Sequence, residues 1–318
     1  MRRDVDPAIT ATAAGSPDGS IRRKVMIIHN PNAGRQRRRD RLDAVRVELE
    51  RLGCAVDVRT TAGPGDAERY ARGARASAAA GDGPDVVVAA GGDGTINEVV
   101  NGLAGGTMPL ALLPMGTANV LAAEIGLREE PRGIARTIQR GQAVSIHLGE
   151  VNGRRFTLMA GIGLDADVVA SVHPKLKRAT GKFAYAVATL QRWLQYRRHR
   201  FRIEIDGVPH DAAAAVVANG HYYAGRFVSA GDARLTDPWL HVCLFEKPGR
   251  WHAAFYMAGL FGGFLPRLKS FRVVPGRDIA ILEQGARPVQ GDGDVIARLP
   301  VRIRLSDETV PLVMPAAG

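Results

Sequence analysis

The sequence predicts two domains, a doubly wound parallel α/β domain followed by a mostly antiparallel, sandwich-like β domain. In the first part of the chain, short apolar runs alternate with segments of helical periodicity, which is typical of a parallel sheet covered by helices. One run, Asp85–Ala90, is apolar on both faces, as expected of a strand buried between two helix layers. After about residue 146 the segments become short, often β-branched and bounded by Gly, Asp or Pro, which favours antiparallel strands.

The boundaries follow from these changes in pattern. The chain has 318 residues, enough for two domains of ordinary size. We expect a tail over residues 1–20, because that stretch is polar and has no apolar period. The first domain is expected over 21–146 and the second over 147–306. The C-terminal segment, 307–318, is expected to pack back on the first domain.

Each element of the first domain has its own signal. A strand over 24–28 is an apolar run that ends in the turn signal Asn30-Pro31, and the next helix repeats leucine and valine at helical spacing. Five further elements follow: a second strand, an alanine-rich helix, the buried strand described above, a helix after a glycine-rich loop and a fourth strand. The expected helices are 38–52, 66–80 and 96–103, and the expected strands are 24–28, 54–58, 85–90 and 109–114.

The second domain is expected to consist of short strands interrupted by one helix with basic ends. The helix is expected over 182–198. The expected strands are 146–151, 155–159, 201–205, 213–218, 240–245, 271–274, 279–282 and 301–305.

Composition narrows the classes of partner. The net charge is +11 and the pI is about 10.2, so the surface attracts nucleic acid, anionic lipid or nucleotide phosphates. No zinc-finger spacing or aromatic-basic stripe supports nucleic acid, which we do not expect as a partner. Two distant cysteines and the absence of an apolar signal segment favour the cytoplasm. The longest uncharged stretch is interrupted by proline and glycine, so no transmembrane helix is expected.

A glycine-rich loop follows the buried strand. Gly91-Gly92-Asp93-Gly94-Thr95 leads directly into a helix, and glycines let backbone N–H groups approach a phosphate at a helix start. Thr95 and Glu98 have the spacing of a capping box, so a plain capped turn is the alternative interpretation. Asp93 favours a functional site over a plain turn, because an acid among three glycines is costly unless a cation or a proton transfer requires it.

Two further loops follow neighbouring strands. Asn30–Gly34 ends the first strand and Pro114–Asn119 ends the fourth, and the latter offers N–H and hydroxyl donors from Gly116 and Thr117. Loops at the carboxyl ends of parallel strands line one crevice. Each loop alone is an ordinary turn, but together the three loops predict a nucleotide site.

These three motifs resemble those of the diacylglycerol kinase and sphingosine kinase superfamily, and most of all its bacterial soluble lipid kinases. The resemblance covers nearly the whole chain after residue 22 and includes 176–185 and 290–294. NAD kinases share Gly-Gly-Asp-Gly-Thr, but the following Asn97-Glu98 and the loop 116–119 resemble the lipid kinases more.

The resemblance implies a kinase that uses ATP and Mg²⁺ to phosphorylate a lipid hydroxyl, most simply diacylglycerol or a sphingoid or ceramide-type lipid, in the cleft between the domains. It implies that Asp93 holds Mg²⁺ or orients the acceptor. Thr61 has an ordinary loop threonine as its alternative. The residues implied to bind the nucleotide are Asn30, Thr61, Gly91, Gly92, Asp93, Gly94, Thr95, Ile96, Asn97, Gly116 and Thr117.

The segment 290–294 departs from the family pattern. The family sequence there ends in Asp-Gly-Glu with the Glu as the implied general base, whereas this chain has Asp292-Gly293-Asp294, one methylene shorter. A base must come within hydrogen-bond reach of the hydroxyl that it deprotonates. Asp294 is therefore a candidate base, Asp292 is its substitute, and an Asp-Gly turn is the alternative interpretation.

Two other features resemble family sites. The run 235–240 is similar to a Mg²⁺-binding segment and would use the Asp237 carboxylate with the carbonyls of Arg234 and Trp239, although a plain turn explains it too. Asp167 matches an acid that contacts the polar head of the lipid, with an ordinary strand-end acid as the alternative.

An aromatic stretch over residues 251–264 lies between basic residues. It fits either a segment at a membrane interface or a core helix packed on the sandwich. Because the implied substrate is a lipid, we expect a cytoplasmic protein that binds membrane surfaces peripherally. Whether the chain forms a homodimer stays open.

Two alternatives to a lipid kinase remain at this stage. One is an NAD kinase-like phosphotransferase. The other is a nucleotide-binding regulator with weak or no kinase activity, which Asp294 in place of Glu keeps open.

Overall fold

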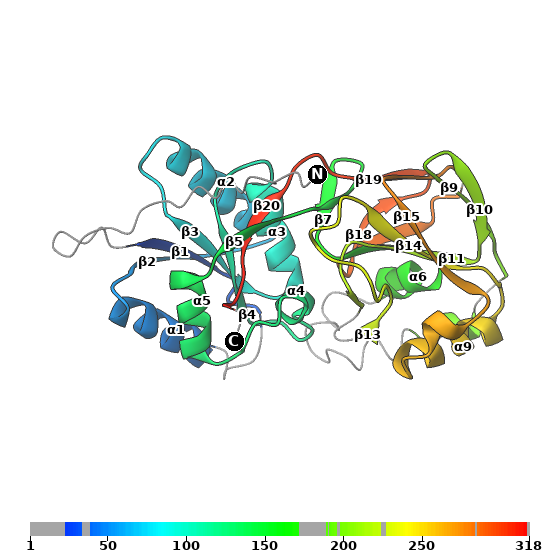
Figure 1. Cartoon of the computed structure of the whole chain (residues 1–318), viewed down its shortest axis with the longest axis horizontal. Helices are drawn as coiled ribbons and strands as arrows, with labels where there is room; N and C mark the ends of the chain where they lie inside the picture. The colour runs from blue at the N-terminus through cyan, green and yellow to red at the C-terminus, as the bar shows by residue number, and fades with distance from the viewer. Residues whose placement is uncertain are drawn as a thin grey trace, which may run out of the picture.

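The protein folds into two lobes that lie side by side (Figure 1). The computed structural model describes residues 23–33, 39–171, 189, 191–195, 198–223, 227–283 and 285–316. The expected tail over 1–20, most of the expected helix over 182–198 and the motif 176–185 lie outside the described residues.

The first lobe is built on a six-stranded sheet with the order β2-β1-β3-β4-β20-β5. Neighbouring strands run parallel as far as β20, and β5 is antiparallel to it. The chain moves from β1 to β2 on one side and then to β3 on the other, so the strand order reverses between β1 and β3. The bounds are β1 Lys24–His29, β2 Ala55–Thr60, β3 Val86–Gly91, β4 Leu110–Pro114, β5 Ala143–Ile146 and β20 Val310–Val313.

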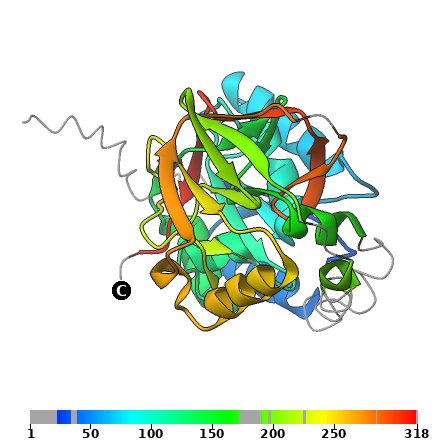
Figure 2. The same cartoon turned by 90° about the vertical axis from the view of Figure 1, so that its right-hand side faces the viewer.

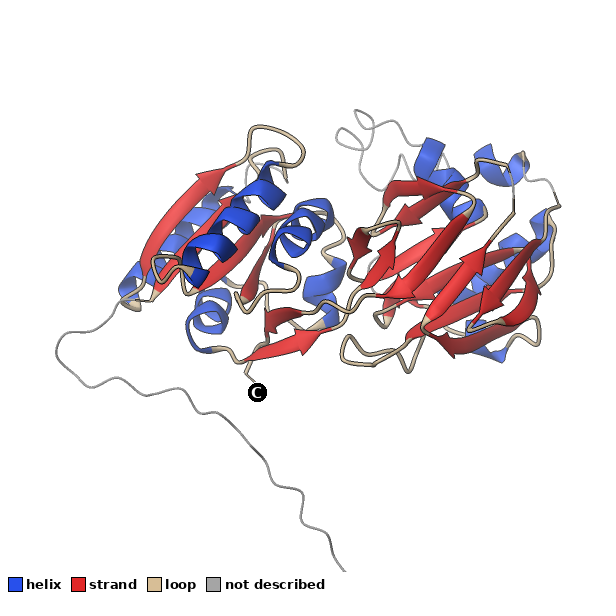
Figure 3. Cartoon of the chain, turned by 90° about the horizontal axis from the view of Figure 1, so that it is seen from above, coloured by secondary structure: helices blue, strands red, loops and turns tan. Residues whose placement is uncertain are grey.

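Helices cover both faces of this sheet, as Figure 3 shows. Helices α1 (Arg39–Arg51) and α5 (Pro131–Arg140) pack on one face, while α2 (Asp66–Ala79) and α3 (Asp93–Leu103) pack on the other. Alternate residues of β3 point to opposite helix layers, and all of its residues are buried. This arrangement confirms the predicted doubly wound domain.

The second lobe contains two six-stranded antiparallel sheets, with the orders β10-β9-β16-β19-β6-β7 and β15-β14-β11-β8-β17-β18. Side chains such as Phe156, Ile203 and Val242 form a buried cluster from both sheets, which confirms the predicted sandwich. The bounds are β6 Gly149–Val151, β7 Arg154–Phe156, β8 Met159–Ile162, β9 Phe201–Ile205, β10 Val208–Ala212, β11 Ala214–Ala218, β14 Leu240–Phe245, β15 Phe271–Gly276, β16 Asp278–Ile281, β17 Pro288–Gly291, β18 Asp294–Arg298 and β19 Val301–Leu305.

Shorter elements complete the chain. Strands β12 (Tyr222–Tyr223) and β13 (Phe227–Val228) form a separate pair. Further helices of the described residues are α4 (Val120–Glu124), α6 (Leu164–Ser171), α9 (Arg250–Phe261) and the 3-10 turn Leu265–Arg267, and residues 189 and 191–194 are helical as well. Within the described part of the chain, no helix combines the length and apolar character needed to span a bilayer.

Two predicted strands are wrong in their extent. The expected strand 146–151 is split, because β5 ends at Ile146 in the first sheet and β6 begins at Gly149 in the second lobe. The expected strand 155–159 is also split between β7 and β8. The backbone N–H groups of Thr157, Leu158 and Met159 donate to the Asp292 side chain at the point where the chain leaves β7 and begins β8.

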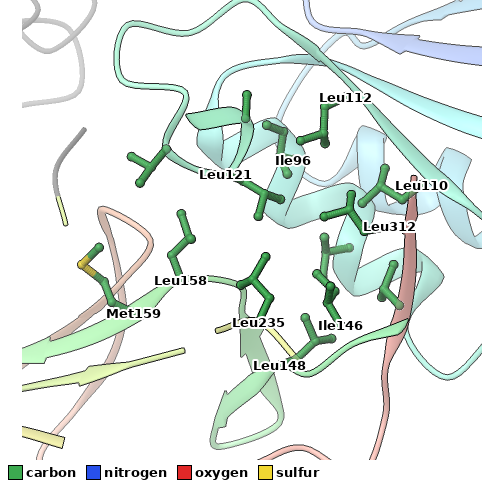
Figure 4. Packing of buried hydrophobic residues seen from close by; sticks show 14 of the residues in the cluster. Ile96, Leu110, Leu112, Leu121, Ile146, Leu148, Leu158, Met159, Leu235 and Leu312 are labelled. Atoms are coloured by element: carbon green, nitrogen blue, oxygen red, sulfur yellow. The ribbon is translucent and has the colours of Figure 1, made fainter. Parts of the chain in front are cut away.

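The lobes are joined by chain crossings and by apolar packing. Strand β20, red in Figure 1, carries the C-terminal segment back into the first sheet between β4 and β5. A buried cluster continues across the boundary, and Figure 4 shows Leu158 and Leu235 of the second lobe near Leu121 and Leu148. This shared core holds the two lobes in one arrangement.

Candidate active site

Three loops and Thr61 gather at the carboxyl edge of the first sheet. Register pairs His29 with both Ala90 and Thr60, and Gly91 with Pro114, so the strands end level with one another. Hydrogen bonds then join each loop to its neighbour's strand: Asn30 N–H donates to the Ala90 carbonyl (3.0 Å), Met115 N–H to that of Gly91 (2.8 Å) and Thr61 N–H to that of His29 (2.8 Å). The sequence prediction that these segments lie together is confirmed.

Two glycines allow the loops to touch. A β-carbon on Gly116 would stand 2.6 Å from the Gly92 Cα and 2.8 Å from Asn119 Oδ1, closer than real β-carbons come. Asn119 Oδ1 is buried, and no partner within the described residues satisfies it. The Gly94 and Thr117 positions beside this contact are exposed. The loops therefore form a glycine-lined surface with an unsatisfied buried acceptor beneath it.

The capping-box prediction is wrong. Helix α3 begins at Asp93, three residues earlier than expected, with Gly92 as its N-cap and no side-chain cap. Thr95 Oγ1 instead accepts a hydrogen bond from Asn30 Nδ2 (3.0 Å), and Glu98 accepts one from the Ala67 N–H of α2 (3.2 Å). The first N–H groups of α3 therefore have no acceptor within their own helix.

Asp93 ties the two glycine loops together. Its carboxylate accepts hydrogen bonds from the N–H groups of Val120 (2.8 Å) and Asn119 (3.1 Å) at the start of α4. Burial raises the pKa of Asp93, the Val120 N–H opposes that rise, and the nearby Asp292 charge adds to it. A carboxylate held in this way fixes the position of the loop that carries Gly116 and Thr117.

Asp292 joins the lobes. Its side chain accepts from Thr157 Oγ1 (2.7 Å), from the N–H groups of Thr157, Leu158 and Met159 (2.7 to 3.1 Å), and from Asn97 Nδ2 across the boundary (3.0 Å). Five donors occupy both oxygens, so the suggestion that Asp292 replaces the base does not fit its surroundings. Its geometry is that of a structural clamp between the lobes.

Two residues implied to bind nucleotide lie elsewhere. The Asn97 amide is engaged at the boundary, where Nδ2 also donates to the Arg155 carbonyl (3.0 Å) and Oδ1 accepts from Arg154 (3.2 Å). Ile96 is fully buried in the core, and its N–H donates to the Gly92 carbonyl. Neither has a polar group directed at a ligand, because both belong to the inward face of α3.

Asp294 reaches the glycine loop from the second lobe. A β-carbon built on Gly94 would lie 3.4 Å from Asp294 Oδ2, so the carboxylate stands directly opposite the start of α3. Asp294 is exposed and is the first residue of β18. The preceding Gly293 has a φ of +88°, which only glycine adopts without strain, and its N–H donates to Gln290 Oε1 (2.9 Å).

Comparisons with known proteins agree with this geometry. A family model described as the diacylglycerol kinase catalytic domain matches residues 24–151, and one described as the YegS C-terminal NAD kinase beta sandwich-like domain matches residues 159–315. Diacylglycerol kinases of two Staphylococcus aureus strains, bovine RF122 / ET3-1 and MRSA252, are each 31% identical over 231 residues, or 71% of this chain and 72% of theirs. The chain belongs to the diacylglycerol kinase family.

Solved structures support the same fold. A crystal structure of a putative diacylglycerol kinase from Bacillus anthracis str. Sterne has a TM-score of 0.74 at 23% identity, covering 92% of this chain and 96% of that one. A second structure of a putative diacylglycerol kinase from this organism has a TM-score of 0.75 at 22% identity, covering 93% and 98%. The family match identifies the chain as a lipid kinase, and these solved structures share its two-lobed fold.

Two acids on α6, Asp165 and Asp167, have different partners in the structure. Asp165, which the sequence analysis did not single out, is partly buried and accepts hydrogen bonds from Gln290 Nε2 (2.8 Å) and from the Tyr223 hydroxyl. Burial raises its pKa, and these two donors oppose the rise. Through Gln290, Asp165 supports the turn that presents Asp294. The only sequence signal for it was its position in Gly163-Leu-Asp-Ala-Asp167.

Asp167, the acid implied to contact substrate, is half-buried on α6. Its Oδ2 lies 3.8 Å from Arg287. Burial raises the pKa of Asp167, and the Arg287 charge lowers it. Its role toward the lipid stays a prediction.

The predicted Mg²⁺ segment has the structure of a hydrogen-bonded turn. Asp237 Oδ2 accepts from the Arg234 N–H (2.9 Å) and faces His241 Nε2 (2.9 Å), and the Arg234 carbonyl accepts from the Asp237 N–H. Trp239 follows in the same turn. The described residues contain no group of three acidic, His or Cys side chains suited to a metal ion. A turn of this kind is compatible with both interpretations, so the role of Asp237 toward Mg²⁺ stays a prediction.

Proposed function

We propose that this member of the diacylglycerol kinase family transfers the γ-phosphoryl group of ATP to a lipid hydroxyl, most simply that of diacylglycerol or a sphingoid or ceramide-type lipid. The position of Asp294 opposite Gly94 carries this proposal. It sets an exposed carboxylate from one lobe against the glycine-lined helix start of the other. A phosphate held at the helix start therefore lies beside a group able to accept a proton.

The glycine loops are suited to the phosphates of ATP. The first N–H groups of α3, which have no acceptor within their own helix, and the helix dipole favour an anion. The exposed Thr117 and the closely packed Gly92 and Gly116 line the same surface. These groups would hold the phosphates in place and stabilise the charge that shifts as the phosphoryl group moves.

Mg²⁺ fits this site only with the nucleotide as a main ligand. Mg²⁺ is commonly bound by one or two carboxylates, several waters and substrate phosphates, where it neutralises the phosphate charge. The carboxylates of Asp93 and Asp294 both lie at the glycine loops, and that of Asp93 already accepts from two N–H groups. Asp294, which faces the start of α3 from the second lobe, would meet the acceptor hydroxyl and take its proton.

The lipid acceptor places the enzyme at a membrane. We propose that the protein acts in the cytoplasm and binds the membrane surface peripherally. The net charge of +11 supports this location, because anionic head groups attract basic proteins.

An assay with labelled ATP tests the proposed function. Short-chain diacylglycerol, sphingosine, ceramide and NAD are offered in turn, and the products are separated by chromatography. Phosphorylation of a lipid supports the proposal. Transfer to NAD would favour the second candidate, an NAD kinase-like activity suggested by the description of the second family model. ATP binding without any product would indicate a regulator instead.

The variant Asp294→Asn examines the base directly. Loss of general base catalysis lowers kcat by about 10²- to 10⁴-fold. Asp294→Glu, which restores the longer side chain, should retain activity. Asp82→Asn, at an exposed carboxylate in the first lobe, is the matched control. Equal activity of Asp294→Asn and Asp82→Asn would remove Asp294 from the mechanism.

A further inference from the structure

Helix α9 buries only one side of itself. Tyr256, Gly259 and Leu260 are buried. Tyr256 also anchors the helix, because its ring packs on Phe245 of β14 (centroids 5.1 Å apart) and its hydroxyl donates to the Ser270 carbonyl (3.0 Å). Figures 1 and 2 show the helix on the outside of the second lobe. The core-helix expectation therefore accounts for one side of α9 only.

The other side exposes large aromatic residues. Trp251, Phe255 and Phe261 are 69%, 52% and 56% exposed, and Trp251 and Phe255 are one helical turn apart. Neighbouring segments extend the same surface. Phe227 packs edge-on against Phe261 (4.7 Å), and Trp193 packs against Trp251 (5.6 Å). We define the α9 face as Trp251, Phe255, Phe261 and Phe227, all of which are exposed.

Basic residues flank α9 in the sequence. The segment from Lys247 to Lys269 contains no Asp or Glu. Its four Lys and Arg residues are exposed, and none forms an ion pair with another described residue. They are Lys247, Arg250, Arg267 and Lys269. An aromatic surface flanked by cations that form no ion pair with a described residue is complementary to a surface that is apolar inside and anionic outside.

We propose that the α9 face is the surface through which the protein docks on an anionic lipid bilayer. Aromatic side chains favour the boundary between head groups and acyl chains, while Lys and Arg near that boundary attract anionic lipid. A second copy of this chain is the less favourable occupant. A symmetric contact through this face brings the same four cations of each copy together. The inference deepens the proposed function, because a lipid kinase must reach its acceptor at a membrane.

Vesicle flotation without nucleotide tests the docking surface apart from catalysis. The full chain is mixed with vesicles of phosphatidylcholine alone or of phosphatidylcholine with phosphatidylglycerol, at low and high salt. We expect binding to the anionic vesicles at least about tenfold stronger than to the neutral ones, and weaker at high salt. Equal binding to both kinds of vesicle, or to neither, would overturn the proposal.

Matched variants locate the surface. Trp251→Ser/Phe255→Ser should lower the partition onto anionic vesicles by about tenfold or more. Val47→Ser, at a residue 54% exposed on α1 of the first lobe, should leave it unchanged. An unchanged partition for the double variant contradicts the proposal. So does a wild-type dimer in sedimentation that the double variant dissociates, because the face would then join two copies.

Kinase activity on water-soluble, short-chain diacylglycerol separates the two proposals. The double variant should retain it, since no α9 residue belongs to the loops or to the Asp294 turn. A wild-type protein that docks on vesicles but phosphorylates no lipid would leave the docking surface standing and overturn the proposed function. A variant that loses soluble activity together with vesicle binding would count against a purely docking role of this face.

Discussion

The Gly94 Cα and the Asp294 carboxylate come from different lobes, yet a β-carbon on Gly94 would stand 3.4 Å from Asp294 Oδ2. The distance is that of an ordinary van der Waals contact, so any side chain at residue 94 occupies the space between the glycine loop and the candidate base. The space between the glycine loop and the Asp294 carboxylate is thus open because residue 94 is glycine.

Gly94→Ala should therefore lower activity without unfolding the protein. The added methyl group fills the space beside Asp294, and we expect kcat/KM to fall by about tenfold, because small displacements of reacting groups are costly. Steady-state kinetics with ATP and short-chain diacylglycerol measure the effect. The control is Gly73→Ala within α2, where a β-carbon meets nothing within 4 Å. It should gain up to about 1 kcal/mol in stability and keep its activity; equal kinetics for both variants would contradict this role of Gly94.

Gly116→Ala should weaken nucleotide binding. Its β-carbon would lie 2.6 Å from the Gly92 Cα, so the two loops must move apart. The N–H groups around Asp93 and Val120 then no longer point at one common position. We therefore expect the Kd for ATP to rise by about tenfold or more. Isothermal titration calorimetry measures this Kd. An unchanged Kd, with Gly73→Ala as reference, would indicate that the loop contact does not shape the nucleotide site.

Asp292→Asn should mainly lower stability, whereas Asp294→Asn should mainly lower activity. Asp292 accepts five hydrogen bonds at the lobe boundary, and its amide variant sets an N–H group against several donors. We expect Asp292→Asn to lose about 2 to 4 kcal/mol in free energy of unfolding. Asp294→Asn should lose activity and keep its stability, because Asp294 is exposed.

Urea unfolding and kinase assays of these two variants distinguish the roles. A stable, inactive Asp292→Asn would return Asp292 to the list of catalytic candidates. A strongly destabilised Asp294→Asn would instead assign Asp294 to the structure of the turn.

The first domain could be predicted from local patterns. The apolar run of β3 and the glycines that follow it specify a buried parallel strand and a loop, and parallel topology alone brings the loops after β1, β3 and β4 together. The residue at which α3 begins was harder to predict from the sequence. Thr95 and Glu98 have capping spacing, but their partners, Asn30 and the Ala67 N–H, are distant in sequence.

The lobe boundary could not be predicted, because its contacts join distant segments. Nothing near Asp292 in the sequence indicates that the N–H groups of 157–159 and the Asn97 amide converge on it. The choice between Asp165 and Asp167 has the same difficulty. Both acids follow Gly163 and both are partly buried, and only the folded structure shows that Asp165 is the one that contacts Gln290.

Asp165 gives a pH-dependent prediction. Burial raises its folded-state pKa above the ordinary value of 3.8. Between those two pKa values the folded protein holds a proton that the unfolded chain has released, so this carboxyl makes the free energy of unfolding fall as pH rises through that window. Asp165→Asn removes the titration. Its stability relative to wild type should therefore improve as pH rises above 3.8, whatever constant loss the amide causes.

Denaturant unfolding from acidic to neutral pH measures the difference in free energy of unfolding between wild type and Asp165→Asn. The variant Tyr223→Phe provides a second test of the Asp165 pKa. The Tyr223 hydroxyl donates to Asp165 and lowers its pKa, so removing that donor should extend the window of falling stability to higher pH. Parallel stability profiles for wild type and Asp165→Asn would show that the carboxyl keeps its ordinary pKa. In that case Asp165 would be ionised at neutral pH while it accepts the hydrogen bond from Gln290. A second negative charge would then lie behind the turn that carries Asp294.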